Sequence, residues 1–291
     1  MLTCKEYAAK RKKELKEYII EKGLKPCLVV IQVGDRPESN SYIRGKVKDC
    51  EEVGIECVVK KLPENINTKN LINHIVVYNR DSKVNGIIVQ LPLPDHIDVE
   101  EVQSWIKENK DVDGFGILSP FNPCTPAGVI GYLKAIDYKF EGKDALVIGR
   151  SDIVGKPLAR MLTDLDCTVT LAHSKTVGVE QIARESDIVF TCIDKIEYFD
   201  NNITYTHYPY QDIIDIGLGI SERDGKLHGN LQERTVKFIR EIHPESICIS
   251  GTGGVGLLTR VALLENVVKA CDMQWEHEFL GKKFNVPNMK R

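Results

Sequence analysis

The chain has 291 residues, of which 42% are hydrophobic and 28% charged, and its formal net charge is -3 at pH 7. This composition is typical of a globular protein with enough apolar material for two domains. A balanced, slightly negative charge argues against a broad basic surface. We therefore expect neither nucleic acid nor an acidic membrane as its main partner.

Cysteine usage and apolar runs favour an intracellular protein. Nine cysteines are scattered from Cys4 to Cys271 without a C-x-x-C pair, so we expect neither a disulfide framework nor a zinc site. No apolar run follows the N-terminus, and no run of about 18 apolar residues is present to cross a bilayer. These features predict a cytoplasmic enzyme with reduced thiols.

The first part of the chain alternates helical and extended patterns. Residues 5–23, "KEYAAKRKKELKEYIIEKG", predict a solvated amphipathic helix. Short apolar runs predict strands at 27–34, 56–62 and 85–94, with helices between them.

The second part repeats this alternation after a Pro-rich segment. "SPFNPCTPAG" at 119–128 predicts a domain boundary, followed by a helix that starts at Gly128. A final helix is expected from about Leu258 to Trp275. Five further strands are expected at 144–149, 167–173, 186–193, 212–218 and 246–250. Alternating strands and helices predict an α/β fold with parallel sheets covered on both faces.

A candidate phosphate site lies in "ALVIGRSDIVGKPLARML", which has the pattern strand, glycine turn, helix. Gly149 ends the strand, and Gly155 comes just before Pro157 at an expected first helical position. Such a turn and helix N-terminus offer backbone N–H groups to a pyrophosphate. Because the G-x-G-x-x-G pattern is incomplete, a plain connection between a strand and a helix remains the alternative interpretation.

The residues around this turn favour NADP over NAD. NAD sites usually place a carboxylate at the end of the second strand, where it binds the ribose hydroxyl. Here that strand ends in His173, Ser174 and Lys175. Arg150 and Ser174, with Lys175 as a further candidate, are suited to bind a 2′-phosphate through charge-assisted hydrogen bonds.

One helix of the first part has two adjacent stripes. It is expected to be capped by Ser39 or Asn40 and to end at Gly54. Its apolar stripe consists of Ile43, Val47 and Cys50. Tyr42 and Lys46 lie one turn apart beside that stripe. Partial burial favours the neutral form of an amine, which suits proton transfer. The alternative is that Lys46 only extends along the core to reach solvent.

Two further features add to the first domain. Gln90 lies at the expected carboxyl end of a buried strand that Pro92 and Pro94 cannot continue, which is where α/β sheets bind ligands. Asp111 and Asp113 lie on one side of a turn closed by Gly114. Since no His or Cys accompanies them in the motif, substrate hydrogen bonding is favoured over metal binding.

Seven motifs occur in an order that resembles the bifunctional methylenetetrahydrofolate dehydrogenase/methenyltetrahydrofolate cyclohydrolase family. They lie between about Pro26 and Ala270 and are "Y-x-x-x-K-x-K-x-C-x-x-x-G", "GIIVQLPLP", "KDVDGF", "PCTP-x-G", "VIGRSDIVGKP", "HSKT" and "GGVG". The resemblance implies oxidation of methylenetetrahydrofolate with NADP, followed by hydrolysis of the methenyl product to 10-formyltetrahydrofolate.

The resemblance also implies a domain organisation. An N-terminal α/β catalytic domain that binds folate is expected at 1–120, completed by a C-terminal helix at 257–291. A Rossmann-like NADP-binding domain with a parallel sheet is expected at 121–256, with a cleft between the domains. The expected assembly is a homodimer joined through the cofactor domains.

Residue roles follow from the same resemblance. Lys46 is expected to be the catalytic lysine, tuned by a hydrogen bond with Gln90, while Tyr42 stacks near the folate and Asp113 binds the pterin. A lysine that can be neutral would not repel the cationic methenyl group that water must attack. Further folate contacts are expected from Leu91, Thr125, Gly253 and Gly254. The expected cofactor residues are Gly149, Arg150, Ser151, Ile153, Gly155, His173, Ser174 and Gly217. No metal is expected.

The chain departs from the family pattern near the expected cofactor site. Residues 192–196 replace an A-x-G-x-P motif, and Asn230 stands in "GNL" where the family has "GDV". Thr252 and Leu257 replace prolines, and the segment before "PCTP" is short. Asp194 adds a negative charge that could weaken pyrophosphate binding. The alternatives are therefore a cyclohydrolase without dehydrogenase activity, a non-catalytic folate- or nucleotide-binding protein, and a dehydrogenase of another substrate class.

Overall fold

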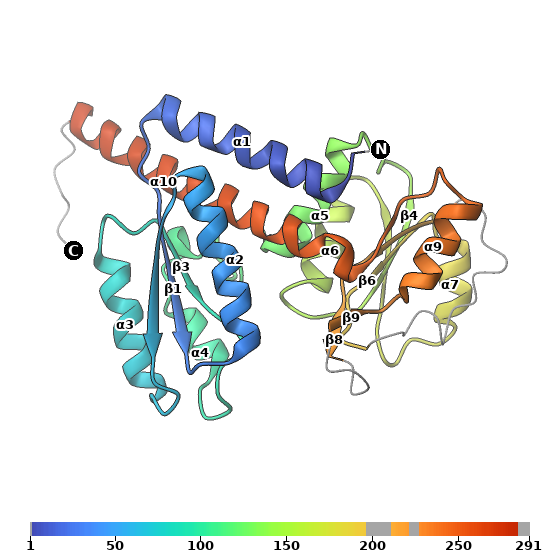
Figure 1. Ribbon diagram of the computed structural model, residues 1–291, viewed down its shortest axis with the longest axis horizontal. Coiled ribbons are helices and arrows are strands. Elements are labelled where there is room, and N and C mark those ends of the chain that lie inside the picture. The colour runs from blue at the N-terminus through green and yellow to red at the C-terminus, as the bar shows by residue number, and fades with distance from the viewer. Residues whose placement is uncertain (1, 196–210, 221–226, 285–291) are drawn as a thin grey trace. The chain divides into compact units, whose positions relative to one another are not determined.

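The computed structural model describes residues 2–195, 211–220 and 227–284 (Figure 1). The chain forms two compact units, which we name by the number of strands in their parallel sheets. The three-stranded unit consists of Ala9–Cys124 and Arg260–Arg291, and the five-stranded unit of Met1–Ala8 and Thr125–Thr259.

The three-stranded unit begins within α1 (Cys4–Lys22), which confirms the predicted N-terminal helix, and ends with most of α10 (Val255–Phe284). Its other elements are β1 (Cys27–Val33), α2 (Pro37–Val53), β2 (Glu56–Leu62), α3 (Thr68–Arg80), β3 (Gly86–Val89), α4 (Val99–Ser104) and the 3₁₀ helix η1 (Glu108–Lys110). The strands are ordered β2-β1-β3, and both pairs are parallel.

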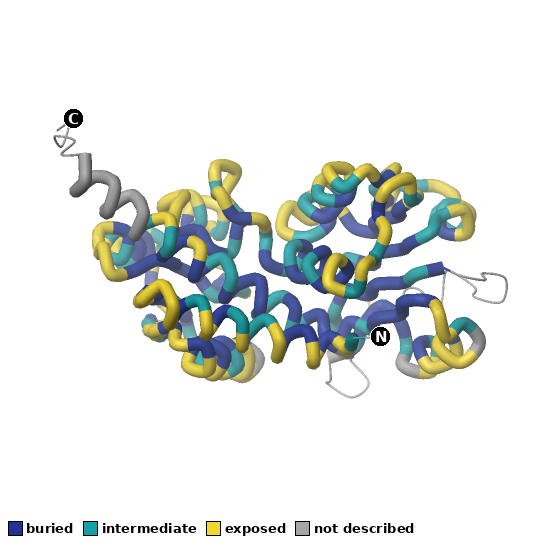
Figure 2. Tube along the Cα trace, turned by 90° about the horizontal axis from the view of Figure 1, so that it is seen from above, coloured by how far each residue is buried: buried dark blue, intermediate teal, exposed yellow. Residues whose placement is uncertain are grey.

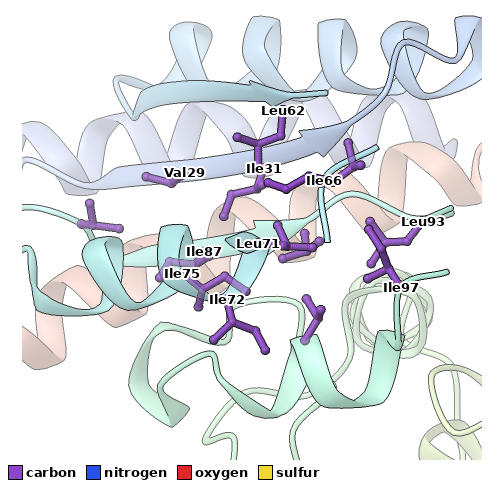
Figure 3. Close-up of a cluster of buried hydrophobic side chains, with 14 of the residues drawn as sticks. Val29, Ile31, Leu62, Ile66, Leu71, Ile72, Ile75, Ile87, Leu93 and Ile97 are labelled. Carbon is purple, nitrogen blue, oxygen red and sulfur yellow. The ribbon is translucent and has the colours of Figure 1, made fainter. Parts of the chain in front are cut away.

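The central strand β1 is covered on both faces. Val29 and Ile31 belong to a cluster with Leu71 and Ile75 of α3 (Figure 3). The alternate residues, such as Leu28, point to the opposite face and are also fully buried. Burial on both faces explains why the strand is apolar at almost every position, and it confirms the predicted parallel sheet.

Helix α2 starts earlier than its sequence predicted. Arg36 is the N-cap residue without a side-chain cap hydrogen bond, so the expected capping by Ser39 or Asn40 was wrong. Pro37 starts the helix instead, because its fixed φ angle suits a first helical position and it has no N–H to satisfy. The predicted end was correct. Gly54 is left-handed, with φ 91°, and its N–H donates to Cys50.

Strand β3 covers only Gly86–Val89 of the predicted 85–94 strand. The N–H of Gln90 makes one more bond, of 2.9 Å, to the carbonyl of Ile31. Beyond it, Pro92 and Pro94 cannot donate to a neighbouring strand. Gln90 therefore directly follows the carboxyl end of β3, as predicted.

The five-stranded unit is a doubly wound α/β domain. It contains α5 (Cys124–Ala135), β4 (Asp144–Ile148), α6 (Gly155–Thr163), β5 (Thr168–Ala172), α7 (Val179–Glu185), β6 (Ile188–Thr191), β7 (Asp212–Asp215), β8 (Leu218–Ile220), β9 (Leu227–Gly229), α9 (Glu233–Ile242), β10 (Cys248–Ile249) and the 3₁₀ helix η3 (Gly251–Gly253). Its main sheet is parallel throughout, as predicted, and is ordered β10-β7-β6-β4-β5. The order reverses between β4 and β6, which is the switch point where such folds bind ligands.

Burial distinguishes the central strands from the edge strands. Strands β4, β6 and β7 are buried along nearly their whole length, whereas the edge strand β5 alternates between exposed and half-buried residues before the buried Ala172. Figure 2 shows buried segments of the chain in dark blue and exposed ones in yellow. The antiparallel pair of β8 and β9 was not predicted. Each of these strands has three residues, too few for a recognisable period.

Three helix boundaries differ from the predictions. Helix α5 starts at Cys124 and not at Gly128, since Pro126 is tolerated in a first turn. Helix α6 starts at Gly155, two residues before Pro157. Helix α10 is longer than the predicted 258–275, and the end of the expected 257–291 helix, residues 285–291, lies outside the described residues. Within the described part of the chain, no helix has the length and hydropathy needed to cross a membrane.

Candidate active site

Lys46 lies in the three-stranded unit with a defined set of contacts. Its side chain extends from α2, and only 6% of its surface is exposed. The Nζ atom donates a 3.2 Å hydrogen bond to Oε1 of Gln90 and lies 5.0 Å from the centre of the Tyr42 ring. Lys48, two residues further along the same helix, is exposed. The structure thus brings together the predicted trio of Tyr42, Lys46 and Gln90.

The Gln90 amide is oriented from both of its ends. Its Nε2 donates a 2.7 Å hydrogen bond to the carbonyl of Leu91, while Oε1 accepts from Lys46. The Leu91 carbonyl can only accept a hydrogen bond, so the Gln90 NH₂ group must face it and Oε1 must face the Lys46 amine. The position of Gln90 after β3 therefore fixes a hydrogen-bond acceptor beside the lysine.

The two carboxylates of the "KDVDGF" turn have different surroundings. Asp111 is buried, and its Oδ2 accepts a 2.7 Å hydrogen bond from the Gly116 N–H while its carbonyl accepts one from the Ser119 hydroxyl. Asp113 is half-buried, and among the described residues its carboxylate receives only a long 3.9 Å contact from the Cys124 thiol. Asp111 is committed to the shape of the turn, whereas Asp113 retains acceptor capacity for a ligand.

Burial and mutual charges shift the ionisation of this group. Desolvation raises the pKa of Asp113, and the positive charge of Lys46 partly opposes that effect. Burial, followed by the charge of Asp113, raises the pKa of Tyr42 to about 12. Burial and then the charge of Asp113 also raise the pKa of the Cys124 thiol well above its ordinary value. Tyr42, Lys46, Asp113 and Cys124 thus lie close enough to influence one another, with Lys46 and Cys124 buried, Asp113 half-buried and Tyr42 exposed.

Asn266 stabilises the Asp113 turn and was missed from the sequence. Its Nδ2 donates to the carbonyls of Val112, at 2.9 Å, and of Asn122, at 3.2 Å. It therefore fixes the backbone directly before Asp113. The available signal was its place as a polar residue in the apolar part of α10, "VALLENVVKA", where a half-buried amide needs hydrogen-bond partners.

Two cations for which no role was predicted from the sequence also stabilise the three-stranded unit. Lys110 is buried and donates to the carbonyls of Tyr78, at 3.0 Å, and Asp81, at 2.6 Å, close to the C-terminus of α3. Arg260 of α10 lies 2.8 Å from Oδ2 of Asp49 on α2, one turn after Lys46. Both cations fix elements that carry predicted site residues.

A second group of predicted residues surrounds the turn between β4 and α6. Gly149 has a φ angle of 121°, and a Cβ there would lie 2.6 Å from the carbonyl oxygen of Cys192. At Gly155 a Cβ would lie 2.0 Å from the Gly149 carbonyl oxygen. Ser151 Oγ accepts from the N–H groups of Val154 and Gly155, at 3.2 and 3.3 Å. Only glycine fits at both positions, because a Cβ at either one would collide with backbone atoms of the same unit.

The carboxyl end of β5 presents polar residues beside this turn. His173 donates its N–H to the Thr176 hydroxyl, and its Nδ1 accepts from the Lys175 N–H, so the chain turns back here. Ile148 of β4 pairs with Ala172 of β5 in the parallel register. Arg150 and Ser174 each lie two residues beyond that pair, at matching positions, and both are exposed. This arrangement suits recognition of one phosphate by both residues.

The other predicted residues belong to the five-stranded unit, apart from Leu91. Gly217 follows β7, and a Cβ there would lie 2.0 Å from the Ile193 carbonyl oxygen. Thr125 receives a 3.1 Å hydrogen bond from Thr259. Gly253 ends η3, and Gly254 has a φ angle of 145°. Ile153 is exposed between Gly149 and α6. Within the described ranges, no three Cys, His, Asp or Glu side chains gather as metal ligands.

Known proteins match the chain over nearly its whole length. The profile of the tetrahydrofolate dehydrogenase/cyclohydrolase catalytic domain matches residues 2–113, and that of the NAD(P)-binding domain of the same family matches residues 123–275. The chain belongs to this family. The resemblance inferred from the seven motifs is therefore confirmed, as is the two-domain α/β fold class.

Relatives agree with this assignment. The bifunctional protein FolD of Ruminiclostridium cellulolyticum is 40% identical over 286 residues, which cover 94% of this chain and 98% of that protein. A crystal structure of the FolD methylenetetrahydrofolate dehydrogenase/cyclohydrolase from Campylobacter jejuni is 38% identical, with a TM-score of 0.82 and coverage of 94% and 98%. The Trypanosoma brucei enzyme, complexed with NADP cofactor and inhibitor, is 27% identical, with a TM-score of 0.82 and coverage of 94% and 97%.

We expect Gly155→Ala to weaken cofactor binding selectively. The new methyl group would lie 2.0 Å from the Gly149 carbonyl oxygen, so the turn and the start of α6 must move. Titration of NADPH by fluorescence should show an affinity lower by about tenfold or more, while methenyltetrahydrofolate hydrolysis is retained. Gly256→Ala is the control, because no atom within 4 Å would meet its Cβ and its φ angle lies outside the left-handed region. Normal NADPH affinity of Gly155→Ala would contradict the assigned phosphate site.

Proposed function

We propose that the protein oxidises 5,10-methylenetetrahydrofolate to 5,10-methenyltetrahydrofolate with NADP and hydrolyses the methenyl form to 10-formyltetrahydrofolate. The observation that supports this proposal best is the buried Lys46, in contact with Tyr42 and Gln90, in a chain that matches both domain profiles of the family. The two FolD relatives and the trypanosomal enzyme support the same pair of activities.

The hydrolytic step needs a group that takes a proton from water. Water attacks the cationic methenyl carbon and loses one proton to a base, which gives a carbinol. The carbinol hydroxyl then loses its proton to form the C=O bond while the bond between the carbon and N5 breaks and N5 is protonated, so the carbon remains on N10 as a formyl group. We assign proton transfer to Lys46, whose Nζ is held by the Gln90 amide. Tyr42 gives the folate a ring on which to stack, and Asp113 provides acceptor oxygens for the N–H groups of the pterin.

The oxidative step depends mainly on orientation. NADP, when bound, supplies the hydride acceptor, so the protein must hold the nicotinamide ring close to the carbon of methylenetetrahydrofolate that loses the hydride. We assign the pyrophosphate to the glycine turn at 149–155, because the N-terminus of α6 follows it directly and a helix N-terminus favours a bound anion. Arg150 and Ser174 are assigned to the 2′-phosphate, which favours NADP over NAD.

The remaining assignments are also part of this proposal. We assign folate binding to the three-stranded unit and NADP binding to the five-stranded unit, whose bounds stand in place of the expected 1–120 and 121–256. The protein acts in the cytoplasm as a homodimer joined through the NADP-binding domains. Light scattering of the purified chain tests the dimer, because a monomeric mass would contradict it.

One experiment separates the two activities. Purified protein is incubated with methylenetetrahydrofolate and NADP, NAD or neither, and the absorbance of the methenyl product is followed with time. A separate incubation starts from methenyltetrahydrofolate without cofactor. We expect NADP-dependent formation in the first reaction and enzyme-dependent decay in the second. Decay without formation would establish a cyclohydrolase alone, and the absence of both would overturn the proposal.

Arg150→Ala should raise the KM for NADP far more than the KM for NAD. Loss of a charge-assisted contact to phosphate costs about 1.5–3 kcal/mol, or one to two decades in affinity. Steady-state rates with each cofactor measure the difference. Lys156→Ala removes an exposed cation from the same segment and serves as the control. Equal effects of Arg150→Ala on both cofactors would show that this residue does not contact the 2′-phosphate.

A further inference from the structure

Asn230 connects two segments of the five-stranded unit that depart from the family pattern. It directly follows β9, and its side chain is fully buried. Its Nδ2 donates a 2.9 Å hydrogen bond to the carbonyl of Ile193 and a second one to the carbonyl of Lys195. Both carbonyls belong to the loop that follows β6.

The two carbonyls determine the orientation of the Asn230 amide. Carbonyl oxygens only accept hydrogen bonds, so the NH₂ group must face them, and Oδ1 must point away. Oδ1 has no hydrogen-bond partner among the described residues and is buried. An unpaired buried acceptor is unfavourable, so the two donated bonds must compensate for it.

This contact explains why two departures occur together. The family motif "GDV" would place a carboxylate at position 230, with oxygen atoms against the carbonyls of Ile193 and Lys195. Asparagine has nearly the same shape but offers two donors. The backbone at 193–195, within the sequence that replaces A-x-G-x-P, and Asn230 in "GNL" therefore form one matched contact.

Neighbouring groups hold the same region rigid. Asp215, at the end of β7, accepts backbone N–H bonds from Leu231, at 3.0 Å, and Gly251, at 3.2 Å. A Cβ on Gly217 would lie 2.0 Å from the Ile193 carbonyl oxygen and 2.1 Å from Asn230 Oδ1. The segments after β6, β7 and β9 are thus in direct contact at the carboxyl edge of the sheet.

The place of this contact relates it to the cofactor. A dinucleotide binds across the switch point, here between β4 and β6. Because Arg150 and Ser174 are assigned to the 2′-phosphate, the adenosine end of NADP lies on the side of β5. The nicotinamide end of NADP therefore lies toward β6 and β7. We propose that Asn230 is a positioning residue for the dehydrogenase reaction, which holds the 193–195 backbone where the nicotinamide end of NADP binds. This inference depends on the proposed function.

The test compares Asn230→Asp with Asn230→Ala and the native protein. At about pH 8, an ionised carboxylate would repel both carbonyls, so NADP-dependent oxidation should fall by about tenfold or more, mainly through KM for NADP. Lowering the pH to about 6 shifts the buried carboxyl toward its neutral form, which can donate one bond, so the deficit should shrink. Asn230→Ala should show a deficit that does not change with pH.

Other titratable groups nearby do not obscure this comparison. Asp215 and Cys192 are close to this contact, and Asp194 and Lys195 are exposed on the loop. All of them are present in the native protein and in the variants, so differences between the pH profiles report on position 230. Gln181→Glu is the matched control, since it makes the same chemical change on the exposed face of α7.

Two results would overturn the inference. One is an Asn230→Asp protein with native NADP kinetics at both pH values. The other is an equal loss of methenyltetrahydrofolate hydrolysis, because that would indicate general damage to the fold. If the native protein lacks oxidation activity, the proposed function fails separately. NADPH titration by fluorescence then still tests the inference, since Asn230→Asp should bind more weakly at the higher pH alone.

Discussion

Replacing Lys46 with methionine is expected to lower methenyltetrahydrofolate hydrolysis by about 10²–10⁴-fold, the usual contribution of a positioned acid or base. Methionine preserves most of the side-chain length and apolar contact, but it cannot exchange a proton. The 3.2 Å hydrogen bond to Gln90 and the 5.0 Å contact with the Tyr42 ring are lost together. Binding of a folate analogue should persist, because Tyr42 and Asp113 remain.

Lys48→Met provides the matched control for this prediction. Lys48 lies on the same helix, two residues away, and is exposed, whereas Lys46 is 6% exposed. Both variants lose one positive charge, so a general electrostatic effect on folate binding would be similar in the two. Initial rates of methenyl absorbance decay distinguish them. Near-native hydrolysis by Lys46→Met would disprove the assignment of proton transfer to this residue.

The sequence predicted the elements of both sheets because parallel strands have a strong local pattern. β1 and β4 are apolar at nearly every position, and each is followed by a helix pattern. The ends of elements were predicted less well. Pro37 displaced the expected cap of α2, and a strand expected at 85–94 ended at Val89. Boundaries depend on which backbone groups find partners, and single positions in the sequence indicate that weakly.

The candidate site was predictable where a residue lies on a regular element. Helical spacing placed Tyr42 beside Lys46, and the end of β3 placed Gln90 near the carboxyl edge of its sheet. Contacts between segments distant in sequence could not be obtained in this way. Asn266 lies 154 residues after Val112 in the sequence, yet its side-chain amide binds the Val112 carbonyl and fixes the backbone before Asp113. The roles of Asn266 and Asn230 depend on carbonyls that tertiary packing brings to them.

Replacing Asp113 is expected to impair both folate reactions together, because they share one position of the pterin ring. The pterin edge offers adjacent N–H donors, and one carboxylate can accept two of them. Asp113→Ala should leave these donors unpaired at a cost of about 1–3 kcal/mol each. Asp113→Asn preserves the shape of the side chain but places its amide N–H against an N–H donor of the pterin. We therefore expect it to impair folate binding nearly as much as Asp113→Ala. NADPH affinity should hardly change.

The alternative is that Asp111 binds the pterin and Asp113 only shapes the turn. The contacts of the two carboxylates favour the first assignment. Asp111 Oδ2 already accepts the Gly116 N–H at 2.7 Å, whereas Asp113 has only the distant Cys124 thiol among the described residues. An amide at position 111 can still accept that N–H through its oxygen, so Asp111→Asn should fold and bind folate normally. Titration of a folate analogue into each variant decides between the two: normal binding by Asp113→Asn together with lost binding by Asp111→Asn would reverse the assignment.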